Sequence, residues 1–223
     1  MGRITVAALQ VVAQVMVAIP LMRPHRLAAV VDSIAGSTSD YRIAVIAATG
    51  PCADAAKELP VDLIEDSGGT WAQRINKAFA ACTEPFFMTG ADDLAFRPGW
   101  FEAALIALNQ IPDGGVIAVN DLHNLGGVHF IFDRRYLDSI GGVIDQPPGV
   151  VCCESYVHSY VDDEIRTTAI YHNRWGGVVR DSVVEHLHCG AGKAPHDAVY
   201  AAGEASMSQG HAMYTSRAHL WNG

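Results

Sequence analysis

Two adjacent carboxylates, Asp92 and Asp93, follow shortly after an apolar run, Phe86–Met88, with Gly90 just ahead of them. A buried parallel strand reads as such a run, and ligands of α/β proteins bind beyond the carboxyl ends of these strands. Two carboxylates at that place can bind a hard divalent cation together with the phosphates that it carries. The alternative is a simple turn, because Asp is common wherever a strand ends. The pair alone leaves both interpretations open.

A second set of reactive side chains lies in the second half of the chain. Asp162, Asp163 and Glu164 fall within a segment, 156–175, that we expect to be helical, and a solvated helix face is the alternative to a catalytic base. His186 and His188 are separated by one residue, so in a strand both rings would lie on one side. That arrangement suits a metal, although exposed histidines are also common on strands.

An acidic, glycine-containing stretch precedes the segment 71–82, whose apolar residues recur at helical spacing. Thr70 is the expected N-cap of this helix, and Gly68-Gly69 would let the backbone approach a ligand closely. A plain tight turn is the alternative to a phosphate-binding loop. Nearby carboxylates that could accept hydrogen bonds from a nucleotide are Asp62, Glu65 and Asp66.

Composition limits the classes of function. The 223 residues are half hydrophobic and carry a formal net charge of −9, which suits one compact domain. Such a chain lacks the basic field that nonspecific nucleic-acid binding needs, so we expect no nucleic-acid partner. The five cysteines form no C-x-x-C pair, which argues against a zinc knuckle or a disulfide framework and favours a reducing cytoplasm.

An apolar segment, 4–21, could be mistaken for a signal peptide. Thr5, Gln10 and Gln14 interrupt it and it ends in Pro20, so we interpret it as strand material. No other segment is long and apolar enough to span a bilayer, and we expect no transmembrane segment.

The elements that must position these side chains alternate along the chain. Strands are predicted at 15–20, 42–47, 61–64, 86–88, 116–119 and 128–132, and helices begin near Pro24, Ala53, Trp71 and Pro98. This order predicts an α/β sandwich whose sheet is mostly parallel and ends in antiparallel strands. Beyond it we expect the helix at 156–175, a strand at 178–184, and a loose lid or tail over 189–223 with a helix near 196–206.

The order of these features resembles that of the GT-A nucleotide-sugar glycosyltransferases, in particular their large family-2-like group. The resemblance covers about residues 15–190 and rests on several short motifs. They are Val17-Ala-Ile-Pro20, Gln73-Arg-Ile-Asn76, the D-x-D-like Phe87-Met-Thr-Gly-Ala-Asp-Asp93, Arg134-Arg135 with Gly141-Gly-Val-Ile-Asp145, Val161-Asp-Asp-Glu-Ile165, and His186 or His188.

The resemblance implies a single GT-A domain over 1–223, a Rossmann-like α/β/α sandwich with a less regular C-terminal acceptor side. Its nucleotide-sugar half would span about 15–120, its acceptor and catalytic half about 121–190, and a lid or tail 191–223. It implies transfer of a sugar from a UDP-, GDP- or dTDP-sugar to a glycan, lipid or protein hydroxyl. Inversion and a requirement for Mn²⁺ or Mg²⁺ are also implied.

The same resemblance assigns roles to individual residues. Asp92 would bind the cation together with His186 or His188, and Asp162 or Asp163 would be the catalytic base. The donor would be contacted by Pro20, Asp62, Asp66, Arg74, Asn76 and Asp93. Gly90 stands where the family has the first acid of its D-x-D motif. The ribose contact of that acid is therefore open, and Asp93 could provide it.

Two other functions remain alternatives. A sugar-nucleotide nucleotidyltransferase shares the α/β plan, but its glycine-rich basic loop after the first strand is missing from Pro20-Leu-Met-Arg-Pro24. A non-catalytic carbohydrate-binding protein on a decayed transferase fold is the second alternative, suggested by Gly90. Hydrolysis of a sugar nucleotide would distinguish a transferase from such a scaffold.

Overall fold

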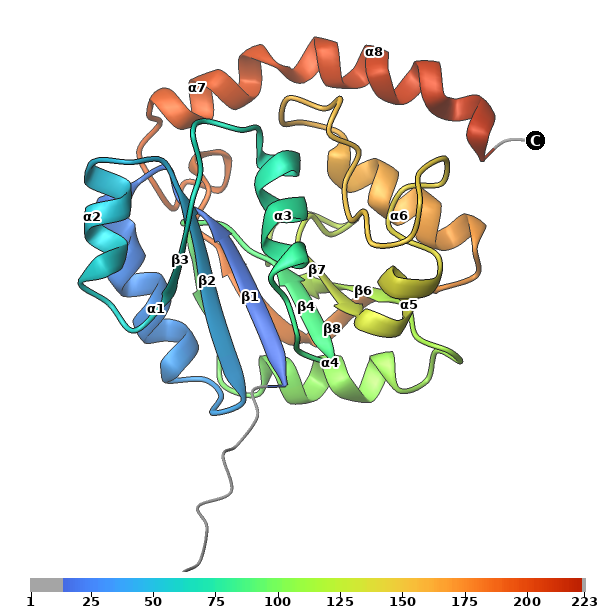
Figure 1. The fold of residues 1–223 in the computed structure, drawn as a ribbon, viewed down its shortest axis with the longest axis horizontal. Helices are drawn as coiled ribbons and strands as arrows, with labels where there is room; N and C mark the ends of the chain where they lie inside the picture. The colour runs from blue at the N-terminus through green and yellow to red at the C-terminus, as the bar shows by residue number, and fades with distance from the viewer. Residues whose placement is uncertain (1–13, 222–223) are drawn as a thin grey trace, which may run out of the picture.

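A curled sheet forms the centre of the molecule, which a computed structural model describes over residues 14–221 (Figure 1). The predicted strand material at 4–13 lies outside the described residues. Along the sheet the strand order is β3-β2-β1-β4-β7-β6-β8-β5. The strands are β1 (Val15–Pro20), β2 (Tyr41–Ala47), β3 (Asp62–Glu65), β4 (Phe86–Thr89), β5 (Leu94–Phe96), β6 (Val116–Asn120), β7 (Phe130–Asp133) and β8 (Trp175–His186).

The predicted mostly parallel sheet is confirmed. Strands β3, β2, β1 and β4 are parallel neighbours, and β8 is parallel to β6. The antiparallel strand β7 lies between β4 and β6, and β5 pairs antiparallel with β8 at the edge. Antiparallel pairing therefore begins in the middle of the sheet, directly beside the strand that carries the two acids.

Helices cover both faces of the sheet, as the alternating pattern predicts. They are α1 (Leu27–Ala35), α2 (Pro51–Lys57), α3 (Trp71–Ala80), α4 (Trp100–Leu108), α5 (Arg134–Ser139), α6 (Val161–Tyr171), α7 (Ala198–Ala205) and α8 (Met207–Arg217), with short 3₁₀ turns η1 (Pro24–Arg26), η2 (Cys189–Ala191) and η3 (Ala218–Leu220). Met16 and Ala18 of β1 pack with α3, α5 and α6, whereas Val17 and Ile19 pack with α1 and α4. Burying each large apolar side chain contributes about 1.5–3 kcal/mol.

Helix α3 begins where Thr70 predicts it. The Thr70 hydroxyl accepts from the Gln73 backbone N–H at 3.3 Å, and Gln73 Oε1 accepts from the Thr70 N–H at 2.9 Å. This reciprocal capping box satisfies two donors that a helix start otherwise leaves open, and such a cap is worth about 1 kcal/mol. It fixes the first turn of α3, and with it Arg74.

Two expectations for the second half are wrong. The helix predicted for 156–175 is confined to α6, because Tyr160 (φ 69°) and Asn173 (φ 56°) adopt left-handed conformations on either side of it. Trp175 then begins β8. The segment expected to be a loose tail is instead ordered as α7, close to the predicted 196–206 helix, and α8.

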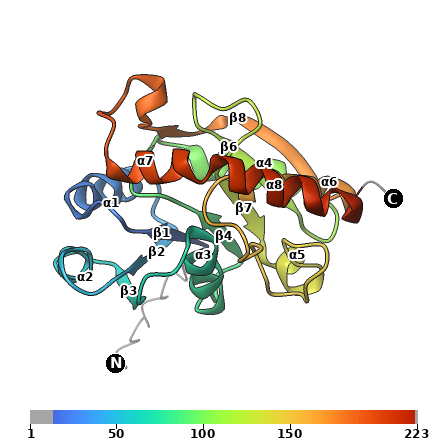
Figure 2. The ribbon, with the colours of Figure 1, turned by 90° about the horizontal axis from the view of Figure 1, so that it is seen from above.

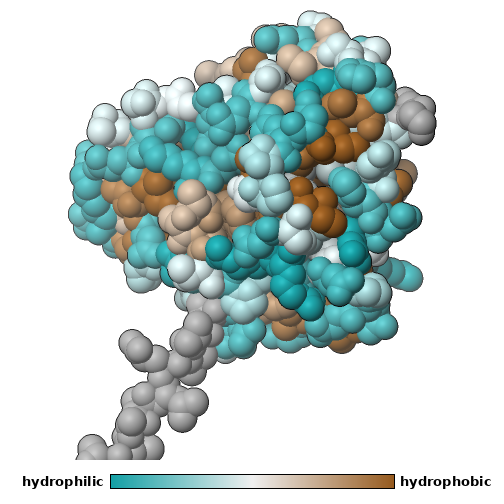
Figure 3. Space-filling model, turned by 45° about the vertical axis from the view of Figure 1, so that its right-hand side comes forward, coloured by the Kyte–Doolittle hydropathy of each residue, from teal (hydrophilic) through white to brown (hydrophobic). Residues whose placement is uncertain are grey.

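Helices α7 and α8 run across the end of the sheet where the parallel strands finish (Figures 1 and 2). Tyr160, just before α6, contacts the rings of His211 and Tyr214 on α8, and the Tyr214 hydroxyl lies 2.8 Å from that of Thr167. The side of the molecule in Figure 3 is mostly hydrophilic, with separate apolar patches. Within residues 14–221 no helix is long and apolar enough to cross a membrane.

Candidate active site

Asp92 lies just beyond β4 and is tied to the end of β1. Its carboxylate accepts at 2.7 Å from the backbone N–H groups of Met22 and Arg23, and at 2.7 Å from Arg23 Nη1. Burial raises the pKa of Asp92 above its ordinary value, although the Met22 and Arg23 hydrogen bonds oppose that shift. Asp92 therefore holds Arg23 in the site.

Asp93 faces a different set of groups. Its Oδ1 lies 3.4 Å from Nε2 of His186, and its Oδ2 accepts from the Tyr200 hydroxyl at 3.0 Å. Burial alone would raise the pKa of Asp93, but the hydrogen bond and charge of His186 outweigh it and hold this pKa well below its usual range. Asp93 is thus an ionised carboxylate beside an imidazole.

The imidazoles near Asp93 have unused nitrogens. Neither ring nitrogen of His129, which is 5% exposed, has a hydrogen-bond partner among the described residues, and the same holds for Nδ1 of His186. Burial and the neighbouring His186 lower the pKa of His129 to about 4, so this ring is neutral. The His188 ring lies 5.0 Å from that of His186, and its Nδ1 accepts from the Gly190 N–H.

These groups fit a divalent cation. Two ligand atoms at about 2.1 Å from one ion lie about 3 Å apart, close to the 3.4 Å between Asp93 Oδ1 and His186 Nε2. Asp121, which is fully buried, places Oδ2 3.9 Å from Nδ1 of His186, too far for a hydrogen bond, and this oxygen accepts from Asn124 Nδ2 at 2.6 Å. Of the ligands predicted from the sequence, His186 and His188 lie together, while Asp92 is engaged by Arg23.

Three predicted donor-binding residues meet at the ends of β1 and β3. Asp66 accepts from the Gly69 N–H at 2.8 Å and from Arg74 Nε at 3.0 Å. Nη1 of Arg74 lies 3.5 Å from the Leu21 carbonyl oxygen, directly after Pro20. The glycine turn, the capped α3 and the end of β1 therefore form one continuous polar wall.

Two other predicted residues lie apart from this wall. Asp62 is at the start of β3, at the amino ends of the parallel strands and therefore at the opposite end of the sheet from the wall. It pairs there with Arg42 at 2.7 Å. The Asn76 amide is engaged by a loop: Oδ1 accepts from the Val151 and Cys152 N–H groups, and Nδ2 donates to Cys152 O and Glu154. Asn76 thus positions this loop.

Arg134, from the predicted acceptor-side motif, also lies away from the wall. It follows β7 at the end of the sheet where β4 begins, and its backbone N–H donates to the Pro85 carbonyl oxygen.

The two candidate bases at the start of α6 differ in their surroundings. Asp163 pairs with Arg166, whereas burial and then the charge of Asp163 raise the pKa of Asp162 to about 6. The segment before α6 contacts the end of α7, since the Ser159 hydroxyl lies 3.4 Å from the Gly203 carbonyl oxygen and from the Ser206 hydroxyl. Asp162 therefore has the pKa of a general base working near neutrality.

The C-terminal segment completes the site with residues that sequence reasoning missed. Asp197 accepts from Arg23 Nε at 2.6 Å, and the guanidinium lies 4.1 Å from the centre of the Tyr200 ring. Two signals in the sequence could have indicated Arg23 and Asp197. Arg23 comes shortly after the first strand, and Asp197 precedes a helix as its N-cap, where its carboxylate accepts from the Val199 and Tyr200 N–H groups. No comparable signal marks Asp121.

The fold is similar to those of several solved structures. S. aureus TarS 1–349 has a TM-score of 0.59 at 10% identity, over 78% of this chain and 60% of that one. Mannosyltransferase PcManGT from Pyrobaculum calidifontis, in complex with GDP-Man and Mn²⁺, has a TM-score of 0.56 at 18% identity, over 78% and 57%. Glucosyl-3-phosphoglycerate synthase from Mycobacterium tuberculosis, with Mn²⁺, UDP and glucosyl-3-phosphoglycerate, has a TM-score of 0.56 at 10% identity, over 79% and 72%.

These similarities establish the fold. The chain spans about 60% of the length of the TarS chain that it matches. No protein-family model and no curated protein matches the sequence.

Proposed function

We propose that this chain, which has the GT-A fold of nucleotide-sugar glycosyltransferases, transfers a sugar from a nucleotide-diphosphate donor to an acceptor hydroxyl with inversion. The observation that carries the proposal is the close pair of Asp93 and His186, with unpartnered imidazole nitrogens beside it, at the carboxyl end of β4. Support comes from similar folds that hold UDP or GDP-Man with Mn²⁺.

Asp93 and His186 would hold Mn²⁺ or Mg²⁺. When bound, such a cation neutralises charge that develops on a diphosphate leaving group. His188 and Asp92 are the alternative ligands. In the proposal Asp92 instead presents Arg23, whose planar guanidinium suits a phosphate oxygen.

The polar wall, to which Pro20, Asp66 and Arg74 belong, would bind the nucleotide of a UDP-, GDP- or dTDP-sugar. The Asp66 carboxylate can accept from a base or ribose, and the Arg74 guanidinium is held against the end of β1. Asn76 would contribute indirectly, because it fixes the loop around Cys152.

Asp162 would be the base. As the acceptor oxygen attacks the anomeric carbon, its proton passes to the Asp162 carboxylate, and the bond to the diphosphate breaks on the opposite side of the sugar. That geometry inverts the anomeric centre. The acceptor would be a hydroxyl of a glycan, lipid or protein. All five cysteines are free thiols, and we place the reaction in a reducing compartment such as the cytoplasm.

The proposal is tested by calorimetric titration with UDP, GDP and dTDP, each with and without Mn²⁺. We expect one of them to bind in a Mn²⁺-dependent manner, and Asp93→Asn to lose that dependence. Asp138→Asn is the matched control, because Asp138 is exposed and pairs with Arg134 at the opposite edge of the sheet. If none of the three nucleotides binds in the presence of Mn²⁺, the proposed donor site does not exist.

Product analysis separates the alternatives. A transferase with a matching sugar nucleotide should release the nucleoside diphosphate slowly to water, and faster with an acceptor. A non-catalytic sugar-binding protein would release none. A nucleotidyltransferase would instead release pyrophosphate from a nucleoside triphosphate and a sugar phosphate.

A further inference from the structure

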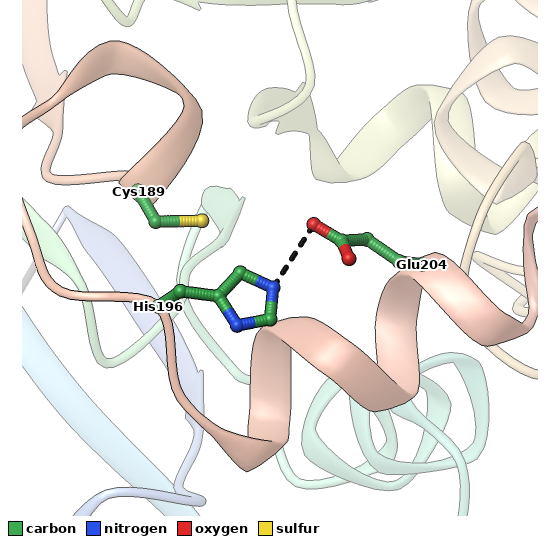
Figure 4. A group of neighbouring side chains, drawn as sticks. All are labelled: Cys189, His196 and Glu204. Atoms are coloured by element: carbon green, nitrogen blue, oxygen red, sulfur yellow. Dashed lines mark hydrogen bonds and ion pairs between the residues drawn. The ribbon is translucent and has the colours of Figure 1, made fainter.

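A second group of metal-ligand side chains lies on the C-terminal segment, outside the proposed transfer site. It comprises Cys189 of η2, His196 in the following loop and Glu204 of α7. One ligand atom from each lies within 4.8 Å of the others, and Nε2 of His196 is 3.1 Å from Oε1 of Glu204. Figure 4 shows the Cys189 sulfur pointing towards the imidazole and the carboxylate.

The spacing of these atoms suits a small ion after minor side-chain rotation. Ligand atoms at about 2.0–2.3 Å from a tetrahedral zinc ion lie about 3.3–3.8 Å apart. The His196–Glu204 distance is just below this range. The sulfur would lie about 3.5 Å from each of the other two ligand atoms, so it has to move inwards by about 1.3 Å at most from the 4.8 Å limit. His196 and Glu204 are exposed and Cys189 is partly exposed, so all three are free to rotate.

The ligand chemistry selects a different metal from that of the Asp93 site. A thiolate and an imidazole favour Zn²⁺, whereas oxygen-rich sites take Mg²⁺ and Mn²⁺. Binding requires the Cys189 thiol to lose its proton, after which the thiolate and the Glu204 carboxylate together balance the two positive charges of the ion. Lys193, the nearest lysine along the chain, is already paired with Glu185 at 3.1 Å.

We propose that Cys189, His196 and Glu204 bind a zinc ion, separate from any cation of the transfer site, and that this ion ties η2, just after β8, to α7. Three protein ligands leave the fourth tetrahedral position to water. Asp197 and Tyr200 lie between His196 and Glu204 in the chain, so the ion would also hold them against Arg23 and Asp93. The inference does not depend on the proposed transfer reaction.

Cobalt provides the first test, because Co²⁺ bound by a thiolate shows a sulfur-to-metal charge-transfer absorption that oxygen and nitrogen sites lack. Of the five cysteines, Cys82, Cys152 and Cys153 are buried, which leaves Cys189 and Cys52 accessible. We expect this absorption in the native protein at about one Co²⁺ per chain, displaced by Zn²⁺. It should vanish in Cys189→Ser and persist in Cys52→Ser.

His196→Ala and Glu204→Gln should each weaken Co²⁺ binding by about tenfold or more, as removal of a direct ligand requires. Because both side chains are exposed, unchanged thermal unfolding without metal should show that these variants fold. The proposal is overturned if the native protein lacks the absorption, if Cys189→Ser retains it, or if both ligand variants bind Co²⁺ as tightly as the native protein.

Limited trypsin digestion tests the tie between η2 and α7. Lys193 lies in the loop between Cys189 and His196 and is exposed, so trypsin can reach it. Trypsin cleaves the loop only in an open conformation, and bound Zn²⁺ lowers the population of that conformation. At about a hundred times its dissociation constant, Zn²⁺ should therefore slow cleavage after Lys193 by at least about tenfold. Mn²⁺ should not, and Cys189→Ser should remove the Zn²⁺ effect. Equal cleavage of the native protein with and without Zn²⁺ would contradict the tie.

Discussion

Gly90 shows why the acidic motif of the GT-A family is incomplete in this chain. The Gly90 N–H donates to the Ala18 carbonyl of β1 at 2.8 Å, and a Cβ built on Gly90 would lie 2.7 Å from that same oxygen. Since real Cβ atoms do not approach backbone oxygens so closely, an aspartate here would push β1 and β4 apart. The close approach of β1 and β4 therefore leaves no room for the side chain of a first acid at this position.

We therefore expect Gly90→Ala to destabilise the protein by about 1–3 kcal/mol, the usual cost of forcing an atom into a packed interior. Urea unfolding measures the change. Gly36→Ala is the control, because Gly36 at the end of α1 has φ −79° and a Cβ there would lie 3.3 Å from the Asp32 carbonyl oxygen, a tight contact but one that a small shift relieves. We expect a smaller change, of about 0.5 kcal/mol. Equal stability of Gly90→Ala and the native protein would show that the strands separate easily.

Asp162 gives the proposed reaction a pH dependence. A base must be ionised to accept a proton, so the transfer rate should fall as pH drops below about 6, the pKa to which burial and Asp163 raise this carboxyl. Asp162→Asn should lower kcat by about 10²–10⁴-fold without changing nucleotide affinity.

The neighbouring acid supplies the control for this assignment. Asp163→Asn removes a like charge from Asp162 and frees Arg166 to pair with it, so the acid limb of the pH–rate profile should move to lower pH. An unchanged profile would show that the acid limb does not report Asp162. A larger loss of kcat in Asp163→Asn than in Asp162→Asn would transfer the role of base to Asp163.

The sequence predicted the position of the acidic pair but not which contacts each of the two carboxylates makes. Adjacent residues point in different directions, and which of them meets an imidazole depends on β8, which arrives about a hundred residues later. Arg23 decides the matter physically, because it occupies the oxygens of Asp92 and leaves Asp93 to His186. No local pattern encodes that choice.

Among the elements, α8 depends on distant anchors. Arg217 near its end donates to both oxygens of Glu164 at 2.8 Å and to Asp145 at 2.6 Å. The helix is largely polar, so sequence periodicity could not reveal it, and its stability comes from partners more than fifty residues away. By contrast, α3 was predicted correctly because its cap and apolar stripe are local. The three-residue β5 is too short to show any period.

Arg217→Met should consequently cost more than an ordinary surface substitution. Within residues 14–221 it leaves Glu164, which is 1% exposed, with only the Tyr156 hydroxyl as a side-chain partner, and an uncompensated buried charge costs about 3–5 kcal/mol. Urea unfolding of Arg97→Met is the control, because Arg97 is exposed and its pair with Glu185 is worth about 0–1 kcal/mol. Adding Glu164→Gln should recover part of the loss; no recovery would mean that Arg217 acts through packing alone.

At the scale of the whole molecule, the proposed site is assembled from both ends of the chain. Arg23 follows β1, Asp93 follows β4, His186 ends β8, and Asp197 and Tyr200 belong to the C-terminal segment. They contact one another beyond the carboxyl ends of the parallel strands, the end of the sheet across which α7 and α8 run (Figure 1). A donor bound there would contact both the segment after β1 and the start of α7, which are far apart in the chain, and would therefore oppose unfolding as a whole.

Thermal unfolding reports that coupling directly. A nucleoside diphosphate with Mn²⁺, at about a hundred times its dissociation constant, stabilises the native state by about 2.7 kcal/mol, which for a chain of this length raises Tm by roughly 5–10 °C. Asp93→Asn should lose the part of the shift that depends on metal. The matching monophosphate at the same concentration should give a smaller shift, because without the second phosphate it binds more weakly. Equal Tm shifts from the diphosphate and the monophosphate, or a diphosphate shift that does not change with Mn²⁺, would place the bound nucleotide away from Asp93 and His186.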